Sequence, residues 1–255
     1  MDALQAALVG LGGLWAGAIN AVVGSGTLVT FPILVAVGFA PVTATISNAM
    51  GLIAGNLAGS WGYRRELAGL GRTLLQLLPA SILGGITGAA LLLHLPESVF
   101  EAVAPALIVV ALLFVLLQPR LQSWVRARRE RTDAPGGRPW LLVGLIYFAG
   151  VYGGYFVAAQ GILLVGILGV FLQGTLQAAN AVKNILVLAV NLVAACSYML
   201  FAFDRIAWPA VALIAVGSLI GGFAGAAIGR RMRPGVLRAV IVVLGLVALW
   251  NMLAP

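Results

Sequence analysis

The sequence has few charged residues, a single cysteine and a single histidine. Charged residues make up 9% of 255 positions, whereas a soluble domain has about 25%. Cys196 alone excludes an intrachain disulfide, and His94 alone makes a metal cluster improbable, so we expect neither a metal site nor a cofactor. Hydrophobic residues make up 62% of the chain, in several charge-free runs close to the roughly 20 residues that cross a bilayer. The composition predicts an all-α polytopic integral membrane protein.

The net charge of +8 is concentrated in three short segments between the hydrophobic runs. Thirteen of the fourteen arginines fall there, and the remaining one, Arg205, lies at the opposite ends of the runs with Asp2, Glu97, Glu101 and Asp204. This asymmetry predicts that the three segments are cytoplasmic and that both termini lie on the outer side of the membrane. Anionic lipid headgroups explain the basic charge, so we expect no nucleic-acid partner. The first run lacks a basic start and a clear cleavage site, so no removable signal peptide is expected. The thirteen arginines are 64, 65, 72, 120, 126, 128, 129, 131, 138, 230, 231, 233 and 238.

The chain divides into two similar halves. Leu83–Ala90 and Ile220–Ala227 share a Gly-Gly-x-x-Gly-Ala-Ala pattern, and Ala16-Gly17 corresponds to Ala149-Gly150. Such small-residue patterns are common where membrane helices pack, but their agreement in order and spacing favours a duplication. We therefore predict an N-terminal transmembrane repeat at 1–119, a basic cytoplasmic loop at 120–139 and a C-terminal transmembrane repeat at 140–255.

Each half is expected to contain one interrupted segment followed by three spans. The interrupted segments, Ala3–Phe39 and Trp140–Leu172, must begin and end on the same side of the membrane. An odd number of spans per half then gives the two repeats opposite orientations, which is the inverted-repeat plan of secondary transporters. The expected spans are Thr43–Tyr63, Thr73–His94, Ser98–Gln118, Gly174–Phe203, Ala207–Gly229 and Gly235–Leu253.

Glycines interrupt both segments at corresponding places. Gly24-Ser25-Gly26-Thr27 breaks the first run, and Gly153-Gly154 with Ala158-Ala159-Gln160-Gly161 breaks the second. A break leaves free N–H groups at a new helix start, where Ser25 or Thr27 can cap and where an anion can bind. The alternative is that the glycines merely let helices approach each other closely.

Lys183 is the only lysine, and it lies inside the predicted span Gly174–Phe203. A charge at the centre of a membrane helix costs about 3 kcal/mol on insertion scales. The one carboxylate inside an expected span, Glu101, lies at the outer end of Ser98–Gln118, so no span carries a carboxylate in its interior to balance the charge. We therefore expect an anionic substrate to supply the counter-charge. The alternative is that Lys183 extends to the headgroups at a helix end.

Polar side chains follow one face of the same span. Gln173, Gln177, Asn180, Asn184 and Asn191 are spaced at helical intervals beside Lys183, and Asn191 is expected to serve in helix packing. The corresponding helix of the first half carries Thr45, Asn48, Asn56 and Ser60 on one side, with Ser47 near the position of Lys183, and Asn56 is expected to pack between helices. The predicted substrate-binding residues are Lys183, Asn180, Asn184, Asn48, Ser47, Asn20, Gly24, Ser25, Gly26, Thr27, Gln160 and Gly161, with no catalytic or metal-binding residue.

These features together predict a membrane transporter of small oxyanions that works by alternating access around a site at the bilayer midplane. No acidic residue lies in the interior of a span, which excludes an intramembrane carboxylate proton relay, and the membrane potential could drive export of an anion. Two alternatives stay open. One is an anion channel, and the other is an intramembrane hydrolase in which Lys183 activates Ser25 as a nucleophile. We expect no enzymatic activity, and a homodimer is one assembly to consider.

Three stretches resemble the TauE/SafE sulfite exporter family, also called the toluene sulfonate uptake permease family. They are Ala16-Gly17-Ala18-Ile19-Asn20-Ala21-Val22-Val23-Gly24-Ser25-Gly26-Thr27-Leu28, then Phe31-Pro32-Ile33-Leu34, and Ala44-Thr45-Ile46-Ser47-Asn48. The resemblance implies transport of sulfite, sulfoacetate, sulfonates or similar organic anions across a bacterial inner membrane. It does not fix the direction of transport, for which we predict export. Members of the family usually have more glycine at both breaks than this chain has, which leaves the substrate open.

Overall fold

The computed structural model describes residues 1–131, 139–172, 175–228 and 234–253, and the residues between these ranges are outside the description. The described residues form helices and connecting turns, with no strand among them. The first half contains α1 (Ala3–Val22), α2 (Thr27–Ala36), α3 (Pro41–Gly62), the 3-10 turn η1 (Arg64–Leu67), α4 (Gly71–His94) and α5 (Glu97–Arg131). The second half contains α6 (Pro139–Tyr155), α7 (Gln160–Phe171), α8 (Leu176–Phe201), η2 (Phe203–Arg205), α9 (Trp208–Ile228) and α10 (Pro234–Leu253).

Five helices are long and apolar enough to cross a membrane, judged by length and composition over the described residues. They are α1, α4, residues 97–120 of α5, α8 and α9, while α2, α6 and α7 are shorter apolar helices. The prediction of an all-α polytopic membrane protein is therefore confirmed.

The structure departs from the predicted elements at the polar connection between the halves. The third span was expected to end at Gln118, but α5 continues to Arg131, because the arginine-rich sequence after Pro119 has good helix formers and no glycine before Gly136. Residues 132–138 of the predicted loop lie outside the described residues, as do Gln173, Gly174 and the arginines at 138, 230, 231 and 233.

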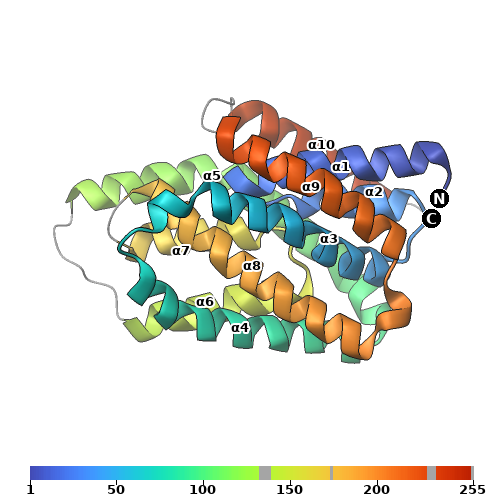
Figure 1. Cartoon of the computed structure of the whole chain (residues 1–255), viewed down its shortest axis with the longest axis horizontal. Helices are drawn as coiled ribbons and strands as arrows, with labels where there is room; N and C mark the ends of the chain where they lie inside the picture. The colour runs from blue at the N-terminus through green and yellow to red at the C-terminus, as the bar shows by residue number, and fades with distance from the viewer. Residues whose placement is uncertain (132–138, 173–174, 229–233, 254–255) are drawn as a thin grey trace.

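The helices of one half pack mainly on helices of the other half. α3 and α8 contact each other in the middle of the bundle, α1 lies along α9 on one face, and α4 lies along α6 on the opposite face (Figure 1). The shorter α2 contacts α10, and α7 contacts α5. Each half therefore depends on the other for its closest neighbours.

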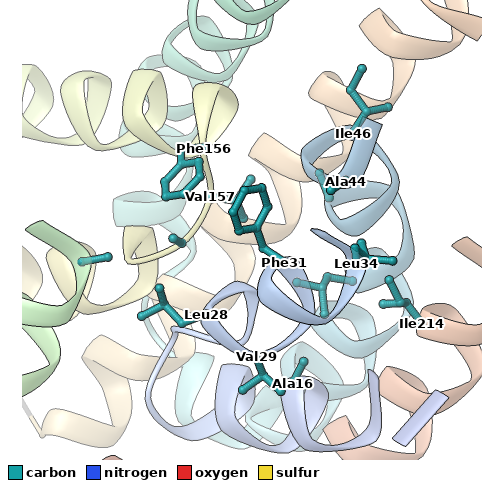
Figure 2. Close-up of a cluster of buried hydrophobic side chains, with 14 of the residues drawn as sticks. Ala16, Leu28, Val29, Phe31, Leu34, Ala44, Ile46, Phe156, Val157 and Ile214 are labelled. Atoms are coloured by element: carbon teal, nitrogen blue, oxygen red, sulfur yellow. The ribbon is translucent and has the colours of Figure 1, made fainter. Parts of the chain in front are cut away.

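An apolar core fills the space between the two interrupted segments. Phe31 of α2 meets Phe156, which follows α6, edge to face at 5.3 Å between ring centroids (Figure 2). The ring centroid of Phe100 of α5 lies 6.0 Å from that of Phe156. Leu28 and Val157 belong to the same buried cluster. Because these side chains come from both halves, the core fixes the two breaks relative to each other.

Two connections predicted to lie on the same side of the membrane meet at one end of the bundle. Arg205 of η2 and Glu97 at the start of α5 form an ion pair at 3.2 Å. The Ser47 hydroxyl of α3 accepts a hydrogen bond from the Ala207 N–H at 2.9 Å, so three elements are joined there. The N-terminus lies toward this end in Figure 1. The side of the membrane that it faces stays a prediction.

Candidate functional site

Both interrupted segments contain a helix break with the same local backbone pattern. In the first, the N–H groups of Val23 and Gly24 donate to the Ile19 carbonyl, and Gly24 has φ +87°. In the second, the N–H groups of Phe156 and Val157 donate to the Tyr152 carbonyl, and Val157 has φ +66°. A β-branched residue with positive φ is rare, so the second break holds Val157 in a costly conformation.

One glycine pair predicted to break a helix does not do so. Gly153 and Gly154 are helical residues of α6, which ends only at Tyr155. A Cβ atom at Gly154 would collide with the Gly85 backbone of α4, and one at Gly153 would collide with the Gln160 side chain. For this pair the prediction of a break was wrong, and the alternative of close packing holds.

The two breaks touch each other in the interior. A Cβ atom at Gly24 would lie 2.6 Å from the Gly161 Cα. A Cβ atom at Gly161 would likewise collide with the Gly24 backbone. A side chain at either position would force the segments apart, so glycine is required at both for this approach. Gly161 is the second residue of α7 and does not itself break the helix.

The start of α2 is not capped in the predicted way. The N-cap residue is Gly26, whose N–H donates to the side-chain oxygen of Asn20 at 3.4 Å. The Thr27 hydroxyl accepts from Asn48 Nδ2 at 3.0 Å, and the buried Ser25 hydroxyl has no partner among the described residues. The expectation that Ser25 or Thr27 caps this helix was therefore wrong, because Asn20 from the preceding helix supplies the acceptor.

Lys183 is enclosed by protein. Its side chain is 1% exposed, so the alternative in which it extends to the headgroups is wrong for this structure. The ammonium donates to the backbone carbonyl of Asn20 at 2.9 Å, and Asn180 Nδ2 donates to the neighbouring Ala21 carbonyl at 3.0 Å. Both carbonyls lie in the last turn of α1, where a helix carries a partial negative charge of about half an elementary charge. The cation thus meets the end of a helix, whereas the anion site was expected at a helix start.

Further polar groups gather at the end of α1 that the ammonium contacts, and we call this set the α8 cluster: Asn20, Asn56, Asn180, Lys183 and Asn184. Asn20 Nδ2 donates to Asn56 Oδ1 at 2.5 Å. A side chain at Gly59 of α3 would touch both Ala21 of α1 and Asn184 of α8. The helices α3 and α8 therefore meet at the end of α1. All five side chains are at most 8% exposed.

Several polar atoms of the α8 cluster have no hydrogen-bond partner within the described part of the chain. They are Asn56 Nδ2, Asn180 Oδ1 and Asn184 Nδ2. A buried polar group without a partner costs about 1–3 kcal/mol, so three of them around one enclosed cation form an expensive arrangement. No carboxylate of the described residues forms an ion pair with Lys183. The arrangement can offer donors and a positive charge to a ligand.

Of the other predicted residues, Gly26 contacts the α8 cluster through the Asn20 side chain, whereas Ser47 and Asn48 bond to other groups. Ser47 is engaged with Ala207 near η2, and Asn48 bonds to Thr27 and to the Thr30 hydroxyl. Gln160 is buried against Gly153, and neither of its amide atoms has a partner among the described residues.

The Ser25 and Lys183 pair of the hydrolase alternative is not formed in this structure. The ammonium of Lys183 donates to the Asn20 carbonyl. The Ser25 hydroxyl has no hydrogen-bond partner among the described residues, so it is not bonded to Lys183.

Comparison with known proteins identifies the family. The sequence model described as "Sulfite exporter TauE/SafE" matches residues 9–252. The chain belongs to the TauE/SafE sulfite exporter family. A relative from Haemophilus influenzae, named "Probable membrane transporter protein", is 27% identical over 235 residues, which cover 91% of this chain and 88% of the relative. "Probable membrane transporter protein YfcA" of Escherichia coli K12 is 30% identical over 149 residues, 57% of this chain and 52% of the relative. No solved structure matches the chain.

Membership of the TauE/SafE family makes the chain a multi-pass membrane protein of a transporter family. The family resemblance alone did not indicate Asn56, which the sequence analysis assigned to helix packing although it follows the same polar face as Asn48. It also gave no sign of Tyr198, whose buried hydroxyl donates to the Gly154 carbonyl at 2.9 Å. Tyr198 closes the end of α6 much as Asn180 closes the end of α1.

Proposed function

We propose that the protein carries small sulfur-containing or organic anions, such as sulfite, sulfoacetate or sulfonates, across the bacterial inner membrane with its arginine-rich segments in the cytoplasm. The α8 cluster is the proposed binding site. The observation that carries the proposal is an enclosed ammonium, Lys183, beside buried polar atoms without partners.

An anion would satisfy these groups together. Lys183 has donor capacity beyond its bond to the Asn20 carbonyl, and Asn56 Nδ2 and Asn184 Nδ2 add neutral donors. Hydrogen bonds that involve an ion are about twice as strong as neutral ones, and the low dielectric of the interior strengthens them further. Binding would therefore repay the cost of keeping the cluster unpaired in the empty protein.

Alternating access is supported by matching contacts in the two halves. A side chain at Gly84 of α4 would collide with the Tyr147 carbonyl of α6, and one at Gly221 of α9 would collide with the Leu14 carbonyl of α1. Tyr147 and Leu14 are separated by 147 − 14 = 133 residues, the same interval that relates Val157 to Gly24 at the breaks. Such pairing is expected of two inverted repeats, and we propose that repeats 1–119 and 140–255 rock against each other around the site.

The enclosure of Lys183 favours a carrier over a channel. A conducting pore needs a continuous path past the selective groups, whereas this ammonium is shielded from solvent. An anion could reach it only after helices move. Saturable flux with counterflow in proteoliposomes would agree with a carrier, and unsaturated flux without counterflow would identify a channel.

The proposed site is tested by replacing Lys183 with methionine, which has a similar volume and no charge. Flux of sulfite and of simple sulfonates into proteoliposomes should fall more than about tenfold, because each charged hydrogen bond contributes about 1.5–3 kcal/mol. Lys183→Arg should keep only part of the wild-type flux, since the planar guanidinium group of arginine does not reproduce the compact ammonium group of lysine. Asn191→Leu, at another buried amide of α8, serves as the control.

Size-exclusion chromatography would establish that the variants remain folded. Wild-type flux in a folded Lys183→Met protein would exclude the α8 cluster as the binding site. Absence of flux for every anion in the wild-type protein would contradict the proposed function as a whole.

A further inference from the structure

The α8 cluster contains an acceptor as well as donors. Asn180 Nδ2 donates to the Ala21 carbonyl at 3.0 Å, and a backbone carbonyl can only accept, so the orientation of this amide is fixed. Its Oδ1 atom is therefore an oxygen acceptor, buried and without a partner among the described residues. Asn180 lies three residues before Lys183 on α8, and the two side chains bond to adjacent carbonyls, Ala21 and Asn20. The acceptor and the ammonium thus lie at the same point of the interior.

An anion without hydrogen-bond donors would leave this acceptor unsatisfied and would be repelled by it. The carbonyl oxygens of Asn20 and Ala21 and the partial negative charge at the end of α1 add to that repulsion. An anion that brings its own O–H group would instead donate to Asn180 Oδ1 while its charged oxygens accept from Lys183, Asn184 and Asn56.

The charge of the cluster also limits the ligand. Lys183 is its only cation, and the end of α1 offsets about half of that charge. A second negative charge on the ligand would be buried without a counter-charge, which is costly in a low-dielectric interior. A singly charged ligand leaves the filled site closer to neutral.

We infer that the α8 cluster selects singly charged oxyanions that carry a hydroxyl donor, and that Asn180 is the specificity-determining acceptor. This inference rests on the proposed transport function of the same site. Among sulfonates and carboxylates, the site should bind monoanions with a hydroxyl group more tightly than monoanions without one. It should bind both more tightly than dianions.

Matched ligand pairs test the inference with the unmodified protein. 2-Hydroxyethanesulfonate and ethanesulfonate have the same carbon count and charge and differ by one hydroxyl, as do glycolate and acetate. Titration calorimetry on the purified protein should give about tenfold tighter binding for the hydroxylated member of each pair, the scale of one satisfied buried acceptor. Sulfoacetate, a dianion, should bind more weakly than 2-hydroxyethanesulfonate.

Variants then assign the preference to Asn180. Asn180→Ala should bring the two members of each pair to within about twofold of each other. Asn191→Ala, a buried amide on the same helix outside the cluster, should keep the preference. Lys183→Met should weaken both members alike.

The outcomes separate this inference from the proposed function. Equal affinity within both pairs for the wild-type protein, with binding lost in Lys183→Met, would overturn the inference and leave the anion site standing. Retention of the preference in a folded Asn180→Ala protein would also overturn it. If no anion binds the wild-type protein, the proposed function fails, and the inference fails with it.

Discussion

Lys183 lies at the carbonyl end of α1, where the helix offers it a partial negative charge in place of a carboxylate. Tyr198 has a comparable position at the end of α6, where its hydroxyl bonds to Gly154. At both breaks a side chain from α8 satisfies a carbonyl that the interrupted helix leaves open. The first half uses a cation and an amide for this purpose, and the second half uses a neutral hydroxyl, so only the first end is suited to an anion.

The difference leads to a prediction for Tyr198→Phe. Removal of the hydroxyl leaves the buried Gly154 carbonyl without this partner, so the free energy of unfolding should fall by about 1–3 kcal/mol. Denaturant unfolding in detergent micelles measures the change. Stabilisation by added anion should be preserved. Tyr155→Phe, at a partly exposed tyrosine of α6, is the control, and an equal loss of stability in both variants would contradict the assignment.

At this scale the sequence was sufficient to place Lys183, Asn180 and Asn184 together, because all three lie on one helix with a fixed period. It also indicated Asn20 as a site residue, but it did not predict how Asn20 would contact Lys183. The contact between Lys183 and Asn20 joins residues 163 positions apart, and it depends on the register between α1 and α8. Ser47 is a second example. It corresponds to Lys183 in the sequence of the other half, but this correspondence did not predict its hydrogen bond with the Ala207 N–H.

At the scale of helices, glycine determines which elements lie together. Gly217, Gly221 and Gly225 of α9 meet the α1 backbone, where any added Cβ atom would overlap backbone atoms. Backbone cannot rotate away as a side chain can, so these contacts tolerate no larger residue. The repeated glycine motif was visible in the sequence, but its partner was not, because the motif specifies a close approach without specifying the helix that approaches.

A pair of glycine substitutions tests this packing. Gly221→Ala should lower the stability of the folded protein by about 1–3 kcal/mol, because the new methyl group meets the Leu14 backbone. Gly10→Ala has open space around it and should raise stability by up to about 1 kcal/mol through helix propensity. Thermal unfolding of the two purified variants in the same detergent compares them. A more stable Gly221→Ala protein would mean that α1 and α9 are farther apart than described.

At the scale of the whole molecule, two polar contacts join separate elements at one end of the bundle. The ion pair between Glu97 and Arg205 and the hydrogen bond from Ala207 to Ser47 join α5, η2 and α3. An exposed ion pair contributes little free energy, typically below about 1 kcal/mol, so the contact can open at low cost. Rocking of the repeats would separate these elements.

Cross-linking of that end tests whether it moves during transport. In a Cys196→Ser background, Glu97→Cys combined with Arg205→Cys should lose anion flux after treatment with a short bifunctional thiol reagent, while either single cysteine variant treated in the same way should keep it. Proteoliposome flux before and after treatment gives the comparison. Full flux through a completely cross-linked protein would show that this end need not open.

The packing of helices from one half against helices of the other also affects how the protein folds during its synthesis and membrane insertion. α1 leaves the ribosome well before α9, the helix that covers its glycine face. α1 must therefore stay in the membrane without its main packing partner until α9 has been synthesised and inserted. An N-terminal fragment that stops before α9 would expose the face that carries Gly13 and Gly17, and quality-control proteases in the membrane would be expected to remove it.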